Sequence, residues 1–454
     1  MPHSSIVHDL RSAHSADALL TGAPLPTLLY FALPIILGNI FQQLYSIVDA
    51  IVVGNFLGDL PLSGISVASP IVDVANALVI GGTIGVGVLC AHYCGASEGE
   101  RLRCMNATAL LGGGALTLLI ALCGIFFSTP LLRAQGTEEA VCREAAVYLQ
   151  LVFAGLLFCF LYNYYAAMLR SCGNSRTPFL ILLLSSTLHA LLDVLFVGVF
   201  GWGIRGVAFS TVLCQALAAA ACILYAQRRC PPLLLRPANL RFDRQMARLV
   251  LSYAWAAALQ QAVVCIGRLL VQGMLTPLGT STVTGYNMSL RTEQFLFCFS
   301  QGISAAMVVC LSQNLGHGDR PRARRFFRVS VLVELALIAL LGTVCFLFPA
   351  RIVGLFSDNA DVIAAGAQYT GAMAYLYVFA YLGEVIQGFF RGLGRLRLTM
   401  VASLLQVLLR VVLSYLLIPV WGMYGICAAV VSGWVLLAGI EGAYAVRKSR
   451  ALAA

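Results

Sequence analysis

Charged residues are scarce in this chain. Asp, Glu, Lys and Arg together make up 11% of its 454 residues, whereas hydrophobic residues make up 60%. Soluble globular proteins carry roughly 25% charged residues and about 45–50% apolar ones. The composition therefore excludes a water-exposed globule and argues against a disordered chain. It predicts an all-α, polytopic membrane protein.

Lysine is nearly absent, since Lys448 is the only one. The chain contains no G-x-x-x-x-G-K-[ST] phosphate loop and neither the H-E-x-x-H nor the G-x-S-x-G motif of hydrolases. A glycine-rich run from Gly81 to Gly87 lies inside an apolar segment, where small residues favour close helix packing over phosphate binding. We therefore expect no ATP site and no enzyme activity, so that any transport work comes from an ion gradient.

No paired cysteine framework is present, although the chain has 15 cysteines. Most stand singly in apolar runs, where cysteine behaves as a small hydrophobic residue. Cys90 and Cys94 are four residues apart, but His92 between them points off their face and no second ligand pair is evident. The sequence predicts no disulfide, no metal site and no cofactor.

Twelve apolar segments are long enough to cross a bilayer, which takes about 20 residues each. They lie near 26–53, 63–91, 105–128, 144–168, 178–199, 204–227, 248–275, 281–312, 327–349, 363–390, 398–419 and 423–446. With the N-terminus inside, 22 of the 29 basic residues fall on inside segments, four fall outside and three fall within spans. This asymmetry follows the positive-inside rule and predicts cytoplasmic termini. It also explains the net charge of +10 without a nucleic-acid partner.

The two halves of the chain resemble each other at an offset of 221 residues. Gly81 matches Gly302, Gly95 matches Gly316, and the pattern of Arg170, Gly173 and Arg176 returns at Arg391, Gly394 and Arg397. Because six spans is an even number, the halves should be related by a pseudo-two-fold axis along the membrane normal, with a cavity between them. We expect a tail at 1–24, an N-terminal lobe at 25–227, a cytoplasmic linker at 228–247, a C-terminal lobe at 248–446 and a tail at 447–454.

Ionisable residues inside spans are costly in lipid and indicate function. Asp49 ends a polar face of the first span, and Asp193 lies four residues after His189 on one face of the fifth. Thr211 in the sixth span is a possible third partner. In the first half Arg205, at the edge of the sixth span, counts with the outside loop, and no Arg lies deeper in a span. We therefore expect Asp49 and Asp193 to load and release a proton or a cation rather than to form permanent ion pairs.

The second half places both signs of charge inside its spans. The residues are Arg268, Arg291, Glu293, Glu334, Glu384 and Arg410. Pairing of these acids with Arg, which would lock helices together, is favoured, and a second cation site is the alternative. Candidate substrate-cleft residues are Gln42, Tyr45, Gln260 and Gln261.

The order and spacing of these features resemble the multidrug and toxic compound extrusion (MATE) transporters, in their prokaryotic DinF-like branch. The resemblance covers roughly 26–446. It is carried by Leu33–Ile35, Gln42–Asp49, Gly54–Gly58, Gly95–Arg103, Leu169–Pro178, Leu192–Asp193, Trp202–Gly206, Ser312–Gly316 and Arg391–Gly394. It implies two six-helix lobes that form a V around a central cleft. It also implies export of lipophilic, often cationic compounds in exchange for protons or sodium.

The resemblance also implies coupling residues. In that branch they are an acid in helix one, an Asn-x-x-x-Asp pair in helix five and a Thr in helix six, which fall on Asp49, His189 with Asp193, and Thr211. The Asn is His189 in this chain, and an imidazole can itself titrate near neutral pH, so protons are favoured over sodium. Pro34 is similar to the family's bending point in helix one. The helix-seven Glu of the NorM-like branch has no counterpart beside Gln260 and Gln261.

The leading hypothesis is a monomeric, proton-coupled antiporter that exports amphiphilic organic cations. A flippase for lipid-linked precursors, of the same superfamily, is the first alternative. A receptor without transport activity or a membrane-embedded enzyme is the second, and for either we find no extramembrane domain or reactive group of residues in the sequence.

Overall fold

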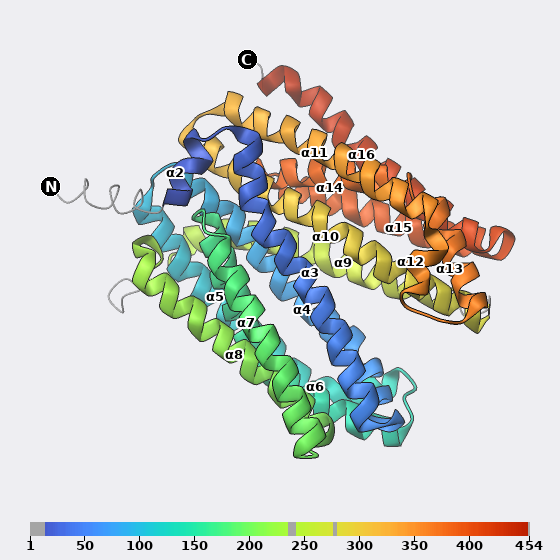
Figure 1. Cartoon of the computed structure of the whole chain (residues 1–454). Coiled ribbons are helices and arrows are strands. Elements are labelled where there is room, and N and C mark those ends of the chain that lie inside the picture. Colours follow the sequence, from blue (N-terminus) through green and yellow to red (C-terminus); the bar gives the residue numbers. More distant parts are fainter. Residues whose placement is uncertain (1–13, 235–241, 276–278, 453–454) are drawn as a thin grey trace. The chain divides into compact units, whose positions relative to one another are not determined.

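The computed structural model describes residues 14–234, 242–275 and 279–452, and these form helices joined by short turns, with no strand in those ranges (Figure 1). The helices of the first half are α2 (His14–Thr21), α3 (Pro24–Leu57), α4 (Asp59–Gly95), α5 (Gly99–Ala134), α6 (Glu139–Ser171), α7 (Arg176–Asp193), η1 (Val194–Val199), α8 (Gly203–Arg229) and η2 (Pro231–Leu233). Those of the second half are α9 (Arg244–Gly273), α10 (Thr280–His317), α11 (Arg320–Leu347), α12 (Pro349–Gly354), α13 (Ala360–Met373), α14 (Tyr377–Gly392), α15 (Leu396–Trp421) and α16 (Met423–Leu452). The side chains of a few helical residues, among them Tyr45 and Asp49, lie outside the described part, as do residues 235–241 of the expected linker.

The high helical content is expected for a chain that crosses a lipid bilayer. A bilayer offers no hydrogen bonds to peptide groups, so each spanning segment must satisfy its own backbone, as an α-helix does. Among the described residues, 11 helices are long and apolar enough to cross a membrane. One further pair, α13 and α14, is bent by 58° at a short break and makes a twelfth span when counted as one. The predicted fold class and span count are confirmed.

The described helices group into two compact units. The first consists mainly of Leu37–Ala262 with Gln313–Gly318, and the second of Ala23–Ile36, Val263–Ser312 and the chain from Asp319 onward. Three helices, α3, α9 and α10, therefore each contribute to both units. The change of unit within α3 comes two residues after Pro34, a residue that removes one backbone hydrogen bond from the helix.

Each unit has its own buried core. In the first unit α4, α5 and α6 surround Tyr164, whose hydroxyl donates to Asn106 Oδ1 at 2.6 Å. In the second unit the core contains several buried tyrosines, and the rings of Tyr286 and Tyr369 meet edge to face at 5.1 Å. The Tyr381 hydroxyl donates to Leu296 O at 2.7 Å. Each of these tyrosines therefore fills apolar volume, and the hydroxyls of Tyr164 and Tyr381 are satisfied within it.

The glycines that align between the halves mark close backbone contacts. In the first unit, a Cβ on Gly95 would collide with Gln313 O, and a Cβ on Gly316 would collide with His92 O. The two matched glycines thus oppose each other where the ends of α4 and α10 cross. Gly81 and Gly85 likewise lie against the backbone of α9. The expectation that the glycine-rich run serves helix packing is confirmed at these positions.

Candidate ion-coupling site

A polar cluster lies between α7 and α8, which pack side by side (green in Figure 1). α7 ends at Asp193, and six residues of π-helix follow before a turn in which Gly201 and Gly203 adopt positive φ angles of 65° and 60°. Only glycine takes up such angles without strain, so the two glycines let α8 fold back tightly against α7. π-Helical hydrogen bonding is rare in proteins, and where it does occur it is often found at functional sites.

Four side chains make up this cluster. His189 and Asp193 share one face of α7, as the four-residue spacing predicts, and Ser210 and Thr211 face them from α8. His189 Nδ1 lies 2.8 Å from Asp193 Oδ2, and His189 Nε2 lies 2.9 Å from Thr211 Oγ1. The Ser210 hydroxyl donates a short hydrogen bond to Asp193 Oδ1. Asp193 and Ser210 are fully buried, and His189 is 3% exposed. The structure thus brings three of the four predicted coupling residues together.

The His189 imidazole can take up one additional proton if the Thr211 hydroxyl changes its hydrogen-bond partner. Thr211 Oγ1 lies 2.8 Å from Val207 O as well as near the imidazole, but a hydroxyl has only one proton to donate. With a neutral imidazole whose Nδ1–H faces Asp193, Thr211 donates to Nε2. With a doubly protonated imidazole, Nε2–H donates to Thr211, which then turns its own proton to Val207 O. Rotation of one hydroxyl is enough to serve both states.

The other residues predicted for the first half are placed less completely. The side chain of Asp49 lies outside the described residues, as does that of Tyr45, so their relation to the cluster stays a prediction. Gln42 is exposed on α3, and Gln260 is buried on α9. Asp73, whose role the sequence left open, is exposed on α4.

In the second unit, two acids lie beside arginines. Glu384 forms a salt bridge with Arg391, seven residues further along α14, rather than with Arg268, Arg291 or Arg410. Glu293 on α10 accepts hydrogen bonds from Tyr377 and Tyr369 at 3.3 and 3.5 Å. Arg410 on α15 and Arg268 on α9 attract Glu293 electrostatically without reaching salt-bridge distance. No salt bridge joins Arg291 to an acid among the described residues. The expected pairing is thus present for Glu384, but with a different arginine.

Glu334 contradicts the expectation of an arginine partner. It is fully buried on α11, and its Oε1 accepts a hydrogen bond from Ser300 at 3.1 Å, whereas its Oε2 has no partner among the described residues. Glu441 on α16 is also fully buried, and neither of its carboxyl oxygens has a described partner. Glu441 interacts electrostatically with Arg391 and Glu384, and Glu334 does so with Glu384. Two carboxyls, of Glu384 and Glu441, therefore interact with the Arg391 guanidinium, and the third, of Glu334, interacts with Glu384.

Ser210 and Glu441 were missed by the sequence analysis. Ser210 precedes Thr211, so it could have been included as its neighbour, but small hydroxyl residues are frequent in membrane helices and its partner lies on another helix. Glu441 lies within the last predicted span and satisfies the rule used for the other acids.

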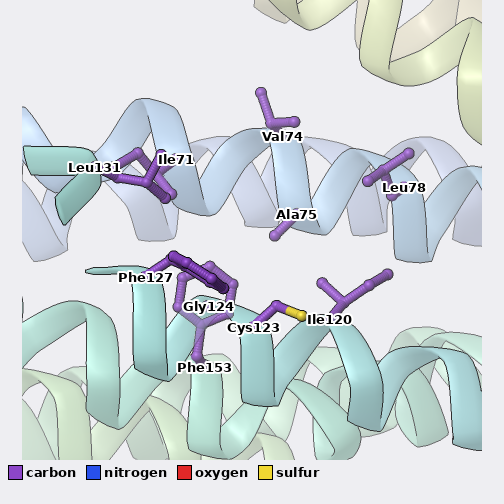
Figure 2. A pocket seen from close by; sticks show the side chains of 10 residues that line it. All are labelled: Ile71, Val74, Ala75, Leu78, Ile120, Cys123, Gly124, Phe127, Leu131 and Phe153. Atoms are coloured by element: carbon purple, nitrogen blue, oxygen red, sulfur yellow. The ribbon is translucent and has the colours of Figure 1, made fainter. Parts of the chain in front are cut away.

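A surface groove of about 370 Å³ lies between α4 and α5 (Figure 2). Figure 2 shows that its lining is entirely apolar, with Phe127 and Phe153 closing one side and Ile120 and Leu78 the other. Such a lining has no group that could hold an ion, so this groove is not part of the coupling site.

Comparison with known proteins supplies the family context. The MatE family model matches residues 34–195 and 256–416. A probable multidrug resistance protein of Bacillus subtilis, YpnP, is 27% identical over 85% of this chain and 86% of its own length. An FAD transporter of Shewanella oneidensis is 26% identical over 76% of this chain and 77% of its own length. The structure of a MOP superfamily transporter from Pyrococcus furiosus superimposes with a TM-score of 0.88 at 18% identity, covering 96% of this chain and 98% of that one.

Proposed function

The chain belongs to the multidrug and toxic compound extrusion (MATE) family of membrane transporters, and from that premise we propose that it is a proton-coupled antiporter that exports lipophilic organic cations. Several of its relatives carry multidrug resistance names, among them YpnP. We propose that the termini are cytoplasmic, on the basis of the distribution of basic residues.

The observation that supports proton coupling is the alternation available to Thr211. Thr211 can donate to Nε2 of a neutral imidazole, or it can accept from Nε2–H of a protonated imidazole while it donates to Val207 O. His189 Nε2 therefore has a hydrogen-bond partner in both states, and a proton can enter the cluster. Sodium is a hard cation and needs oxygen ligands, whereas His189 presents ring nitrogens to the cluster centre. The chemistry of the side chains therefore favours the proton.

Proton entry would be linked to transport through α3. Asp49 is on this helix, and Pro34 lies close to the point at which the helix passes from one compact unit to the other. We propose that the protonation state of Asp193 and Asp49 biases how α3 bends near Pro34, and that this bias releases substrate outward. Each proton supplies about 1.4 kcal/mol per pH unit and about 2.3 kcal/mol per 100 mV, so one or two protons drive a useful gradient.

The test is efflux of a fluorescent lipophilic cation, such as ethidium, from proteoliposomes with proton and sodium gradients imposed separately. We expect efflux with the proton gradient, none with sodium alone, and its loss in Asp193→Asn. The exposed Asp361 in the first turn of α13 gives the matched control, because Asp361→Asn makes the same change away from the His189–Asp193 cluster and should transport normally. Undiminished proton-driven efflux in Asp193→Asn would refute the coupling role.

The Shewanella relative favours a second substrate class. FAD is a large dinucleotide with negative charge, unlike an organic cation, and that protein is named for transporting it. Uptake of FAD and of ethidium into inverted vesicles should therefore be measured on the same preparation. Uptake of FAD without ethidium would replace the cation proposal while leaving proton coupling intact. A lipid-linked precursor, as a flippase would move, provides the third arm.

We propose that the carboxyls of the second unit have two roles. Glu384 locks α14 through its salt bridge with Arg391, and Glu293 is held by tyrosine hydroxyls near Arg410. Glu334 and Glu441, which have carboxyl oxygens without described partners, are the alternative positions for a second exchangeable proton. If this holds, Glu334→Gln should lower the number of protons exchanged per substrate without abolishing efflux.

A further inference from the structure

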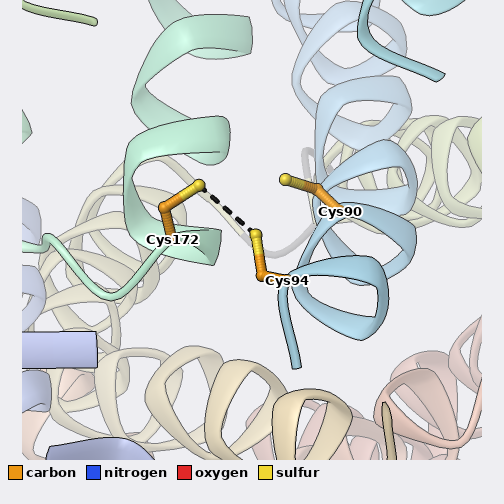
Figure 3. A group of neighbouring side chains, drawn as sticks. All are labelled: Cys90, Cys94 and Cys172. Atoms are coloured by element: carbon orange, nitrogen blue, oxygen red, sulfur yellow. Dashed lines mark hydrogen bonds between the residues drawn. The ribbon is translucent and has the colours of Figure 1, made fainter. Parts of the chain in front are cut away.

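Three cysteine side chains converge where α4 and α6 end (Figure 3). Cys90 and Cys94 share one face of α4, and Cys172 directly follows α6. All three Sγ atoms lie within 4.8 Å of one another, and Cys94 Sγ lies 3.4 Å from Cys172 Sγ. Figure 3 shows the three sulfurs pointing toward one another between the two helices. The sequence analysis considered only Cys90 and Cys94, because the third thiol is 78 residues away from Cys94 in the chain.

The backbone around these thiols is held in place. One turn before Cys90, the Ser171 hydroxyl donates to Gly87 O at 2.8 Å, which ties α6 to α4. Gly87 permits this approach, since a Cβ there would meet Ser171 Oγ at 3.3 Å. After Cys172 the chain turns at Gly173, whose φ is +91°, and Asn174 N donates to Leu169 O at 2.9 Å. The three sulfurs are therefore preorganised by contacts that do not involve them.

The electrostatics of the position favour a cation. Both α4 and α6 end here, at Gly95 and Ser171, and the C-terminal end of each helix carries partial negative charge. That charge disfavours an isolated thiolate but stabilises a thiolate that shares its charge with a metal ion. Cys90 is fully buried and the other two are partly buried, so the site is sheltered yet reachable.

We propose that Cys90, Cys94 and Cys172 bind one soft monovalent metal ion, Cu(I), through their three sulfur atoms. Soft thiolate ligands select Cu(I) and Zn(II) over hard cations. With metal–sulfur bonds of about 2.3 Å, three sulfurs around one ion stand about 4 Å apart, so the present spacing needs shifts of less than about 1 Å. Binding replaces thiol protons, which leave to solvent as the Cu–S bonds form, and no oxidant or reductant is required. The bound ion would join the ends of α4 and α6.

Zn(II) is the competing ion, and Cys230 distinguishes the two. Zn(II) is almost always four-coordinate in structural protein sites and would need a fourth ligand. Cys230, just after α8, interacts electrostatically with Cys94 and Cys172 but lies outside the three-sulfur group. Three-coordinate Cu(I) does not need Cys230.

The experiment uses the reduced, full-length protein in detergent and Cu(I) buffered by a competing chelator. We expect one copper per chain in the wild type, and X-ray absorption should show three sulfur neighbours. Cys94→Ser and Cys172→Ser should each weaken binding by more than the roughly 10–100-fold that loss of an outer-shell partner costs. Cys123→Ser is the matched control, because Cys123 is exposed on α5 away from this group.

Different results would overturn the site itself and the choice of metal ion. Unchanged binding in Cys172→Ser, or binding lost equally in Cys123→Ser, would overturn the site. Tight Zn(II) binding that disappears in Cys230→Ser, with no copper bound in competition, would overturn the three-sulfur Cu(I) assignment. If Cys172→Ser fails to fold, Cys94→Ser and a copper-dependent rise in the melting temperature of the wild type still decide the question. None of these results depends on proton-coupled transport.

Discussion

The two units solve the problem of a carboxyl in a membrane in different ways. In the first unit Asp193 Oδ1 accepts from Ser210 and Oδ2 lies 2.8 Å from His189 Nδ1, and among the described residues no Arg or Lys forms a salt bridge with it. In the second unit Glu384 pairs with Arg391, Glu441 interacts with the same arginine, and Glu334 interacts with Glu384. Three oxygens of Glu334 and Glu441 have no described hydrogen-bond partner. A histidine can gain or lose its charge near neutral pH, whereas an arginine cannot. The first arrangement therefore suits a cycle of protonation. The second suits a fixed positive charge, and it contains more carboxyl groups than this charge can neutralise.

The largest effect should come from removing the fixed cation. Arg391→Met leaves the carboxyls of Glu384 and Glu441 without their guanidinium. Breaking a fully buried pair by removing one partner costs about 3–5 kcal/mol, and this partly buried pair should approach the lower end of that range. We expect a loss of that order in the free energy of unfolding, measured by denaturant titration in mixed micelles. Glu441→Gln removes a carboxyl in place of the cation and should cost less than about 1 kcal/mol. Equal losses in the two variants would mean that Arg391 does not organise the cluster.

An intermediate effect is expected in the first unit. Ser210→Ala removes the hydroxyl that donates to Asp193 Oδ1, and a hydrogen bond to a charged, buried group contributes about 1.5–3 kcal/mol. Ser66→Ala deletes a hydroxyl that bonds to its own helix at an exposed position, and it should change the stability by less than about 0.5 kcal/mol. Thermal unfolding of both variants at neutral pH compares them. If the two midpoints fall together, Asp193 does not depend on Ser210.

Residues close in sequence were predictable at both sites, and residues brought together by packing were not. The spacing of His189 and Asp193 fixes a shared helix face, and the apolar runs fix the spans, because both depend only on helix geometry. Arg391 lies seven residues after Glu384 on the same face of α14, so this pair was also within reach of helix geometry. The partner of Glu334, Ser300, depends on how α10 and α11 are rotated about their axes, which hydrophobicity alone does not determine. For the same reason, the sequence could not predict that Cys172 lies beside Cys90 and Cys94. The helix break inside the tenth span, at 374–376, also carried no proline or charge to reveal it.

The smallest expected effect is a shift in the pH dependence of transport. It distinguishes the two units most directly, because we expect it for a variant of the first unit and not for one of the second. Thr211→Val removes the oxygen that accepts Nε2–H from a protonated His189, but it leaves the Asp193 contact in place. Protonation of the cluster then loses about 1 kcal/mol of stabilisation, which corresponds to a shift of roughly half to one pH unit. Both states lose the contact with Thr211, but an unpaired charged Nε2–H costs more than an unpaired neutral nitrogen. The protonated state is therefore weakened more, and the pH at which transport is half-maximal should move downward. Thr211→Ser, which retains a hydroxyl, should restore the wild-type profile, and Ser300→Ala at Glu334 should leave that pH unchanged. A profile that stays in place in Thr211→Val would show that His189 does not take up the coupling proton.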